Sequence, residues 1–148
     1  MNSFMEPRIS IITLGVSDME KSYSFYKEGL GLPTTMSKEH GVIFFQTSGV
    51  CLALYPLEKL AEDVGPEWPQ KVASGFSGIT LAHNTHSEEE VDQLLQRAEK
   101  AGGKIEKPAQ KVFWGGYSGY FSDPDGHLWE VAYGDCWDFH EDGSLVIP

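Results

Sequence analysis

A single carboxylate stands inside an apolar stretch near the end of the chain. Residues 127–132 read His-Leu-Trp-Glu-Val-Ala, and Glu130 is the only acidic residue among them. Because burying an unpaired carboxylate costs several kcal/mol, such a residue usually has a partner or a function. A desolvated carboxylate can exchange a proton near neutral pH or accept hydrogen bonds from a ligand. Glu130 is therefore the candidate catalytic residue.

The residues before Glu130 predict a hairpin that would position it. Asp123-Pro124-Asp125-Gly126 is a turn sequence, since Pro presets φ and Gly tolerates a positive φ. Side chains alternate along strands, so Glu130 shares a face with Leu128 and Ala132. Pairing Ser122 with His127 would add further residues to that face, which we expect to line a cleft: Tyr117, Gly119 and Phe121.

Two copies of one supersecondary unit account for most of the chain. In the first, a β-branched strand (8–16) precedes a capping box at Ser17 and Glu20, a helix, and a hairpin of residues 42–47 and 50–55. The second repeats the plan: strand 78–83, a capping box at Ser87, strand 104–106 and the final hairpin. The sequence predicts one α+β domain (1–148) of two βαβββ modules, about 8–63 and 77–134, forming a curved mixed sheet around a shared cleft, with a tail at 135–148.

The repeat also predicts counterparts of Glu130. The hairpin glycines Gly49 and Gly126 differ by 77 positions, which places Ala53 opposite Glu130. The first strands differ by 67 positions, which pairs Ile11 with Gly78. By strand parity, a mostly apolar set joins Ala53 on the cleft face: Thr13, Phe44, Gln46, Cys51 and Tyr55.

Bulk properties exclude several classes of partner. The net charge is −11, and no Lys or Arg cluster could neutralise phosphates, so neither nucleic acid nor an anionic membrane surface is an expected partner. The two cysteines, Cys51 and Cys136, form no disulfide framework or metal-type spacing. With no signal-like N-terminus and no apolar run of about 18 residues, we expect a cytoplasmic protein.

The motifs resemble those of a known superfamily. ITLGVSDMEKSYSFYKEGLGLP (12–33) and DPDGHLWEV (123–131), within paired βαβββ modules, are similar to the vicinal oxygen chelate superfamily of glyoxalases, bleomycin-resistance proteins, fosfomycin-resistance enzymes and extradiol dioxygenases. The resemblance implies a cleft in which the enzymes bind a divalent metal through His, Glu or Gln. The corresponding positions are Ile11, Ala53, Gly78 and Glu130. Since only Glu130 could be a ligand, we expect no metal and no other cofactor.

Two functions follow from that departure. One is a metal-free protein of the bleomycin-resistance type that binds a small organic ligand through Glu130, with Thr13, Phe44, Cys51, Tyr55, Trp114 and Tyr117 as further contacts. The other is a lyase or isomerase of the glyoxalase type, with Glu130 as general base or a metal held by unassigned histidines: His83, His86, His127 and His140. The tail and the resemblance also predict a homodimer.

Overall fold

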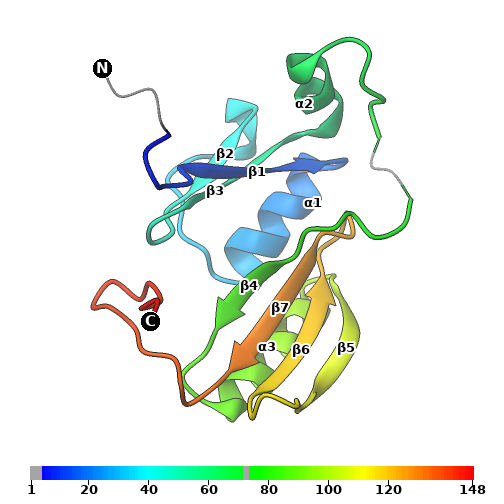
Figure 1. The fold of residues 1–148 in the computed structure, drawn as a ribbon. Helices are drawn as coiled ribbons and strands as arrows, with labels where there is room; N and C mark the ends of the chain where they lie inside the picture. The colour runs from blue at the N-terminus through cyan, green and yellow to red at the C-terminus, as the bar shows by residue number, and fades with distance from the viewer. Residues whose placement is uncertain (1–4, 72–73) are drawn as a thin grey trace.

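The computed structural model describes residues 5–71 and 74–148 (Figure 1). The first module contains β1 (Ile11–Val16), α1 (Met19–Tyr23) with a π-helical continuation (Ser24–Gly29), a short 3-10 turn (Lys38–His40), β2 (Ile43–Phe45), β3 (Cys51–Pro56) and α2 (Leu57–Val64). The second contains β4 (Leu81–Asn84), α3 (Glu88–Lys100), β5 (Lys104–Lys111), β6 (Tyr117–Ser122) and β7 (Leu128–Tyr133).

Both modules use the same strand topology. The strand orders are β1-β3-β2 in a three-stranded sheet and β4-β7-β6-β5 in a four-stranded sheet. In each, the last strand runs parallel to the first and antiparallel to its hairpin partner. The predicted α+β fold of paired modules with mixed sheets is therefore confirmed.

The two modules differ from the predicted repeat in the number of strands and in the residue at which a first strand begins. The first has no strand between α1 and β2; instead Gln46 N donates to the Pro33 carbonyl at 2.8 Å and Thr34 Oγ1 to the Phe44 carbonyl at 2.7 Å. In the second, β4 begins at Leu81 rather than Gly78, because Gly78 has φ 82°, outside the extended region.

The first helix also begins one residue later than predicted. Asp18, not Ser17, is its N-cap, and its carboxylate accepts the Lys21 N–H at 3.1 Å. At α3 the predicted cap is confirmed, since Ser87 Oγ accepts the Glu90 N–H at 3.2 Å. The reciprocal half of that box is shifted: the Glu90 carboxylate accepts from His86 N at 3.0 Å rather than from Ser87.

One hydrophobic core joins the modules. Phe25 and Tyr26 are fully buried and belong to the same cluster as Leu54, Phe121 and Val131. Helix α1 lies between the first sheet and the second module, and α3 lies behind β6 and β7 (Figure 1). The second sheet therefore packs one face on α3 and turns the other away from the helices, whereas α1 covers one face of the first sheet and α2 packs at the end of the other. Among the described residues, no helix is long and apolar enough to cross a membrane.

Tyr26 of the first module and Asp123 and Trp129 of the second form a hydrogen-bonded lock between the two modules. Asp123 is buried; its Oδ2 accepts the Tyr26 hydroxyl at 2.6 Å, and its Oδ1 accepts the backbone N–H groups of Asp125 and His127, each at 2.9 Å. Trp129 Nε1 donates to the Tyr26 hydroxyl oxygen at 3.1 Å. The turn sequence thus has a structural role that spans both modules.

Neighbouring groups of the same turn add further contacts. Asp125 accepts the Ser17 N–H at 2.9 Å, and His127 Nε2 lies 2.9 Å from the Gly15 carbonyl oxygen. His127, one of the unassigned histidines, is therefore engaged with the backbone of β1. Burial, followed by the Asp123 carboxylate, raises the pKa of the Tyr26 hydroxyl.

Removing this network should destabilise the fold. Asp123→Ala leaves the Tyr26 hydroxyl and two backbone donors without their acceptor, so we expect a loss of about 2–3 kcal/mol; Tyr26→Phe should cost about 1–2 kcal/mol. Urea unfolding followed by circular dichroism measures both values. Tyr23→Phe is the matched control, because its hydroxyl makes only a 3.4 Å contact with the Met36 carbonyl. Equal losses for Tyr23→Phe and Tyr26→Phe would contradict the role of the lock.

The raised pKa of Tyr26 also predicts a pH dependence. The folded hydroxyl keeps its proton above pH 10, whereas the unfolded tyrosine ionises near pH 10, so unfolding releases a proton and stability falls as pH rises beyond about 10. Tyr26→Phe should make that fall shallower between about pH 10 and 11. Urea midpoints of both proteins across this range test the point. Parallel curves would show that Tyr26 is not responsible.

Candidate functional site

Glu130 occupies the middle of a row of side chains across the second sheet. It pairs with Ala82 of β4 on one side and Tyr120 of β6 on the other. The predicted register is wrong by one residue, since Ser122 lies opposite Leu128 rather than His127. The cause lies in the turn, where Asp123 itself pairs with His127 through an N–H to carbonyl bond of 3.0 Å.

The corrected register exchanges one tyrosine for another. Tyr117 lies on the face that α3 covers, and its hydroxyl donates to Asp92 Oδ1 at 2.7 Å. The predicted placement of Tyr117, Gly119 and Phe121 beside Glu130 is therefore wrong. Tyr120 takes that place, and the sequence signal that could have found it was the hydrogen-bonding capacity of Asp123, which extends the hairpin by one pair.

The Tyr120–Glu130 pair is an acid next to a phenol. Partial burial, and then the adjacent Glu130 carboxylate, raises the pKa of Tyr120, so the hydroxyl stays protonated at neutral pH. Both residues are half-buried. The row can therefore present one hydrogen-bond donor and one anionic acceptor to a molecule that lies on this face.

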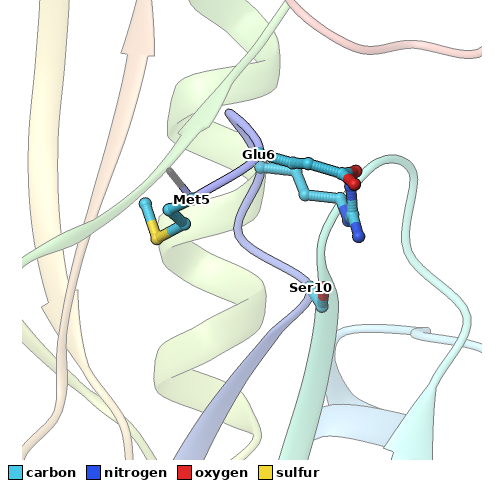
Figure 2. Close-up of a pocket in the computed structure, with 4 residues that line it drawn as sticks. Met5, Glu6 and Ser10 are labelled. Atoms are coloured by element: carbon cyan, nitrogen blue, oxygen red, sulfur yellow. The ribbon is translucent and has the colours of Figure 1, made fainter. Parts of the chain in front are cut away.

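No cation neutralises Glu130 within the described part of the chain. The described residues form four ion pairs, and each of them involves a carboxylate other than Glu130. Arg8, a possible structural partner, instead bonds to Glu6. These two residues lie with Met5 and Ser10 around an open hollow of about 370 Å³ at the N-terminal segment, where Glu6 and Met5 point in opposite directions (Figure 2).

The first module presents the matching row. Thr13, Ala53 and Phe44 lie side by side across β1, β3 and β2. Cys51 and Tyr55 share that face, as parity predicts, and α2 packs near its end, where a Cβ on Gly15 would come within 2.6 Å of Leu57 Cδ1. Their contact with a ligand stays a prediction.

Topology also tests the inferred repeat. Ala53 and Glu130 occupy equivalent places, each on a last strand between a first strand and a hairpin partner. The first strands are offset differently from the prediction: Thr13 corresponds to Ala82, so continuing the register equates Ile11 with Thr80 rather than Gly78. Neither Thr80 nor Gly78 supplies a histidine or carboxylate.

Trp114 is not brought to the Glu130 row. It belongs to the turn between β5 and β6, where a Cβ on Gly134 would lie 2.9 Å from its ring. Gly134 is four residues beyond Glu130, which at strand spacing is roughly 13 Å away. Trp114 therefore borders the start of the tail.

The side chains at the metal positions do not fit a divalent ion, whether Gly78 or Thr80 is taken as the equivalent of Ile11, because Thr80 adds only a neutral hydroxyl. In residues 5–71 and 74–148, no three or more His, Cys, Asp or Glu residues cluster closely enough to hold one. Ile11, Ala53 and Gly78 offer no donor atom, and a single carboxylate falls short of the usual three protein ligands.

The tail forms a pocket that sequence reasoning missed. Residues 138–146 fold back as a small hairpin, with Val146 N donating to the Asp138 carbonyl at 2.9 Å and a bridge between Phe139 and Leu145. A pocket of about 800 Å³ lies between this hairpin, the β2–β3 end of the first module and β4. Its walls come from segments far apart in the chain, so no local sequence pattern predicts the pocket.

Fold and site together define the class of protein. Paired modules with mixed sheets, in which the first and last strands of each module run parallel, are the architecture of glyoxalase-like proteins. The chain matches the Glyoxalase/Bleomycin resistance protein/Dioxygenase superfamily over residues 8–131, and it belongs to that superfamily.

Individual relatives agree with this assignment. The chain is 32% identical over 122 residues to the Bacillus subtilis protein YraH, covering 81% of this chain and 93% of that one. It is 36% identical over 126 residues to Glutathione transferase FosA of Serratia marcescens, covering 83% and 78%. A solved glyoxalase-related enzyme from Fulvimarina pelagi superposes with a TM-score of 0.86 at 38% identity, covering 96% and 99%.

Proposed function

We propose that this protein binds a small organic ligand without a divalent metal, on the sheet face that carries Glu130. The observation that carries the proposal is the Tyr120–Glu130 pair: a half-buried carboxylate outside the ion pairs of the described residues, beside a protonated phenol. The same face of the first module offers Thr13, Phe44 and Cys51 around Ala53, which is itself fully buried.

The expected ligand carries hydrogen-bond donors or positive charge. Glu130 can only accept hydrogen bonds when ionised, and the net charge of the chain is −11. Membership of the superfamily supports a binding role, since the family description includes bleomycin-resistance proteins. The FosA relative is named a transferase, but Ile11, Ala53 and Thr80 of this chain supply neither a histidine nor a second carboxylate beside Glu130.

A second function rests on the same pair. Glu130 can accept a proton from a bound substrate, while the Tyr120 hydroxyl donates a hydrogen bond to the oxygen on which charge develops. That arrangement would make the protein a lyase or isomerase of the glyoxalase type. Glu130→Gln distinguishes the two functions, because the amide keeps the shape of the side chain but is not a base. In a binding protein it should only weaken binding, whereas in a lyase or isomerase it should abolish turnover while the substrate still binds.

Titration with metal-free bleomycin after dialysis against a chelator tests the binding role. We expect binding to survive dialysis and Glu130→Gln to weaken it about tenfold, as expected for the loss of a hydrogen bond to a charged group. Calorimetry gives the affinities, and Glu89→Gln, which removes an equal charge from the exposed surface of α3, is the control. Equal binding by both variants would overturn the role of Glu130, and a metal requirement would overturn the metal-free proposal.

We also propose that the chain forms a homodimer through the face of the first module, so that the ligand contacts on this face would lie between the two copies. Ile11 is 49% exposed and Phe44 39% exposed on the face that carries Ala53, and Ile9 just before β1 is 61% exposed. Such neighbouring apolar side chains are typical of a surface that another copy covers.

Sedimentation measures the assembly directly. The wild-type chain should sediment as a dimer at micromolar concentration, and Phe44→Glu should shift it toward monomer because a charge would be buried in the interface. Phe113→Glu in the exposed β5–β6 turn is the control and should stay dimeric. A wild-type monomer, or identical behaviour of the two variants, would contradict this interface.

A further inference from the structure

The pocket closed by the tail hairpin has three walls of different origin. One is the β2–β3 end of the first module with Ile12 and Leu52; the second is β4 with Trp129 of β7; the third is the tail with Phe139 and Leu145. Its volume of about 800 Å³ lies within the range of small-molecule sites. The pocket is therefore large enough for a multi-ring organic molecule.

Contacts on both modules hold the tail in place. Ser48 Oγ donates to the Asp142 carbonyl at 2.6 Å, which ties the tail to the first module. The Phe139 ring packs on the His86 ring of the second module, with centroids 4.4 Å apart. Within the tail, Ser144 N and Oγ both donate to Asp142 Oδ1, at 2.9 and 2.6 Å. The third wall is thus part of the folded structure.

The lining of the pocket combines apolar side chains with two carboxylates. Ile12, Leu52, Trp129 and Phe139 contribute hydrophobic surface, whereas His83, His86 and Glu90 gather where α3 begins. Glu90 Oε2 accepts the His86 N–H at 3.0 Å, and its other oxygen has no hydrogen bond among the described residues.

The charges in the wall have one sign. None of the described residues that line the pocket is Lys or Arg. Two of them, Glu90 and Asp142, are acidic. Burial lowers the pKa of the His83 imidazole despite the opposing effect of Glu90, so the ring is neutral at neutral pH and can accept a hydrogen bond. An anionic ligand would find no counter-charge here, and a cationic one would find Glu90.

We infer that this pocket is a second binding site, specific for an aromatic or aliphatic molecule bearing a protonated amine. The apolar body lies between Trp129 and Phe139, and the amine pairs with Glu90 beside His83. A cation near two aromatic faces gains further attraction.

The pocket does not include Glu130, although it reaches Ala82 beside Glu130 and Cys51 of the first module. Trp129 and Glu130 are adjacent on β7, so their side chains leave the sheet on opposite faces. The same alternation separates His83 from Ala82 and Leu52 from Ala53. A ligand of the tail pocket therefore contacts Leu52 and Trp129 on the helix side of the two sheets, and it also reaches Cys51 and Ala82, whose side chains belong to the other faces.

Three probes of one shape test the inference: naphthylmethylamine, naphthalenemethanol and naphthoate. We expect the amine to bind about tenfold more tightly than naphthoate, the ratio that a single partly exposed ion pair supports. Proton–nitrogen NMR spectra should show the amine shifting the Trp129 indole signal, which Trp129→Phe identifies. Equal affinities for the amine and the acid, or no movement of that signal, would overturn the proposal.

Matched variants then test whether the Glu90 carboxylate is the group that binds the amine. Glu90→Gln should reduce the preference for the amine about tenfold, and it should fold normally because the amide oxygen can still accept the His86 N–H. Glu89→Gln, the neighbouring residue on α3, should leave the preference unchanged. Phe139→Ala should weaken all three probes by loosening the tail. An amine whose binding responds to Glu130→Gln but not to Glu90→Gln would place it on the other face and sink the assignment.

Discussion

The buried bond between the Tyr26 hydroxyl and Asp123 is the constraint on which the rest of the structure depends. It joins the first helix of one module to the hairpin turn of the other at 2.6 Å, in a site where an unpaired carboxylate would be costly. Asp123 also accepts two backbone N–H groups, and Trp129 donates to the same hydroxyl. Every member therefore has a partner, which is the condition for a buried polar network to stabilise a fold.

That lock determines which faces of the sheets are available for function. By drawing α1 against the second module, it buries Phe25 and Tyr26 in a core shared by both sheets. The opposite face of the second sheet, with Glu130, lies away from the helices, and α2 packs only near the end of the corresponding face of the first sheet. A half-buried carboxylate on such a face can contact a ligand, whereas a carboxylate in the shared core could not.

Local signals were sufficient for the fold and for one symmetry relation of the site. Turn glycines, caps and alternating apolar residues predicted both modules, and the equivalence of Ala53 and Glu130 follows from hairpins of similar design. The position of Tyr120 was not predictable in the same way, because one added pair between Asp123 and His127 reverses the face of every residue in β6. The tail pocket depends on contacts such as that between Ser48 and Asp142, whose sequence separation leaves no local pattern.

Adjacent residues of one strand serve the lock, the pocket and the Glu130 row. Trp129 donates to Tyr26 and also lines the tail pocket, while Glu130 faces the other way beside Tyr120. The equivalent positions Ile11, Ala53 and Thr80 supply no histidine or second carboxylate, which is why the ligand proposed for Glu130 is an organic molecule rather than an ion. A molecule that packs on Trp129 binds only where both modules and the tail are assembled, so its binding free energy adds to the stability of that assembly. Strand β7 thus carries both a residue that stabilises the contact between the modules, Trp129, and the carboxylate proposed to bind a ligand, Glu130.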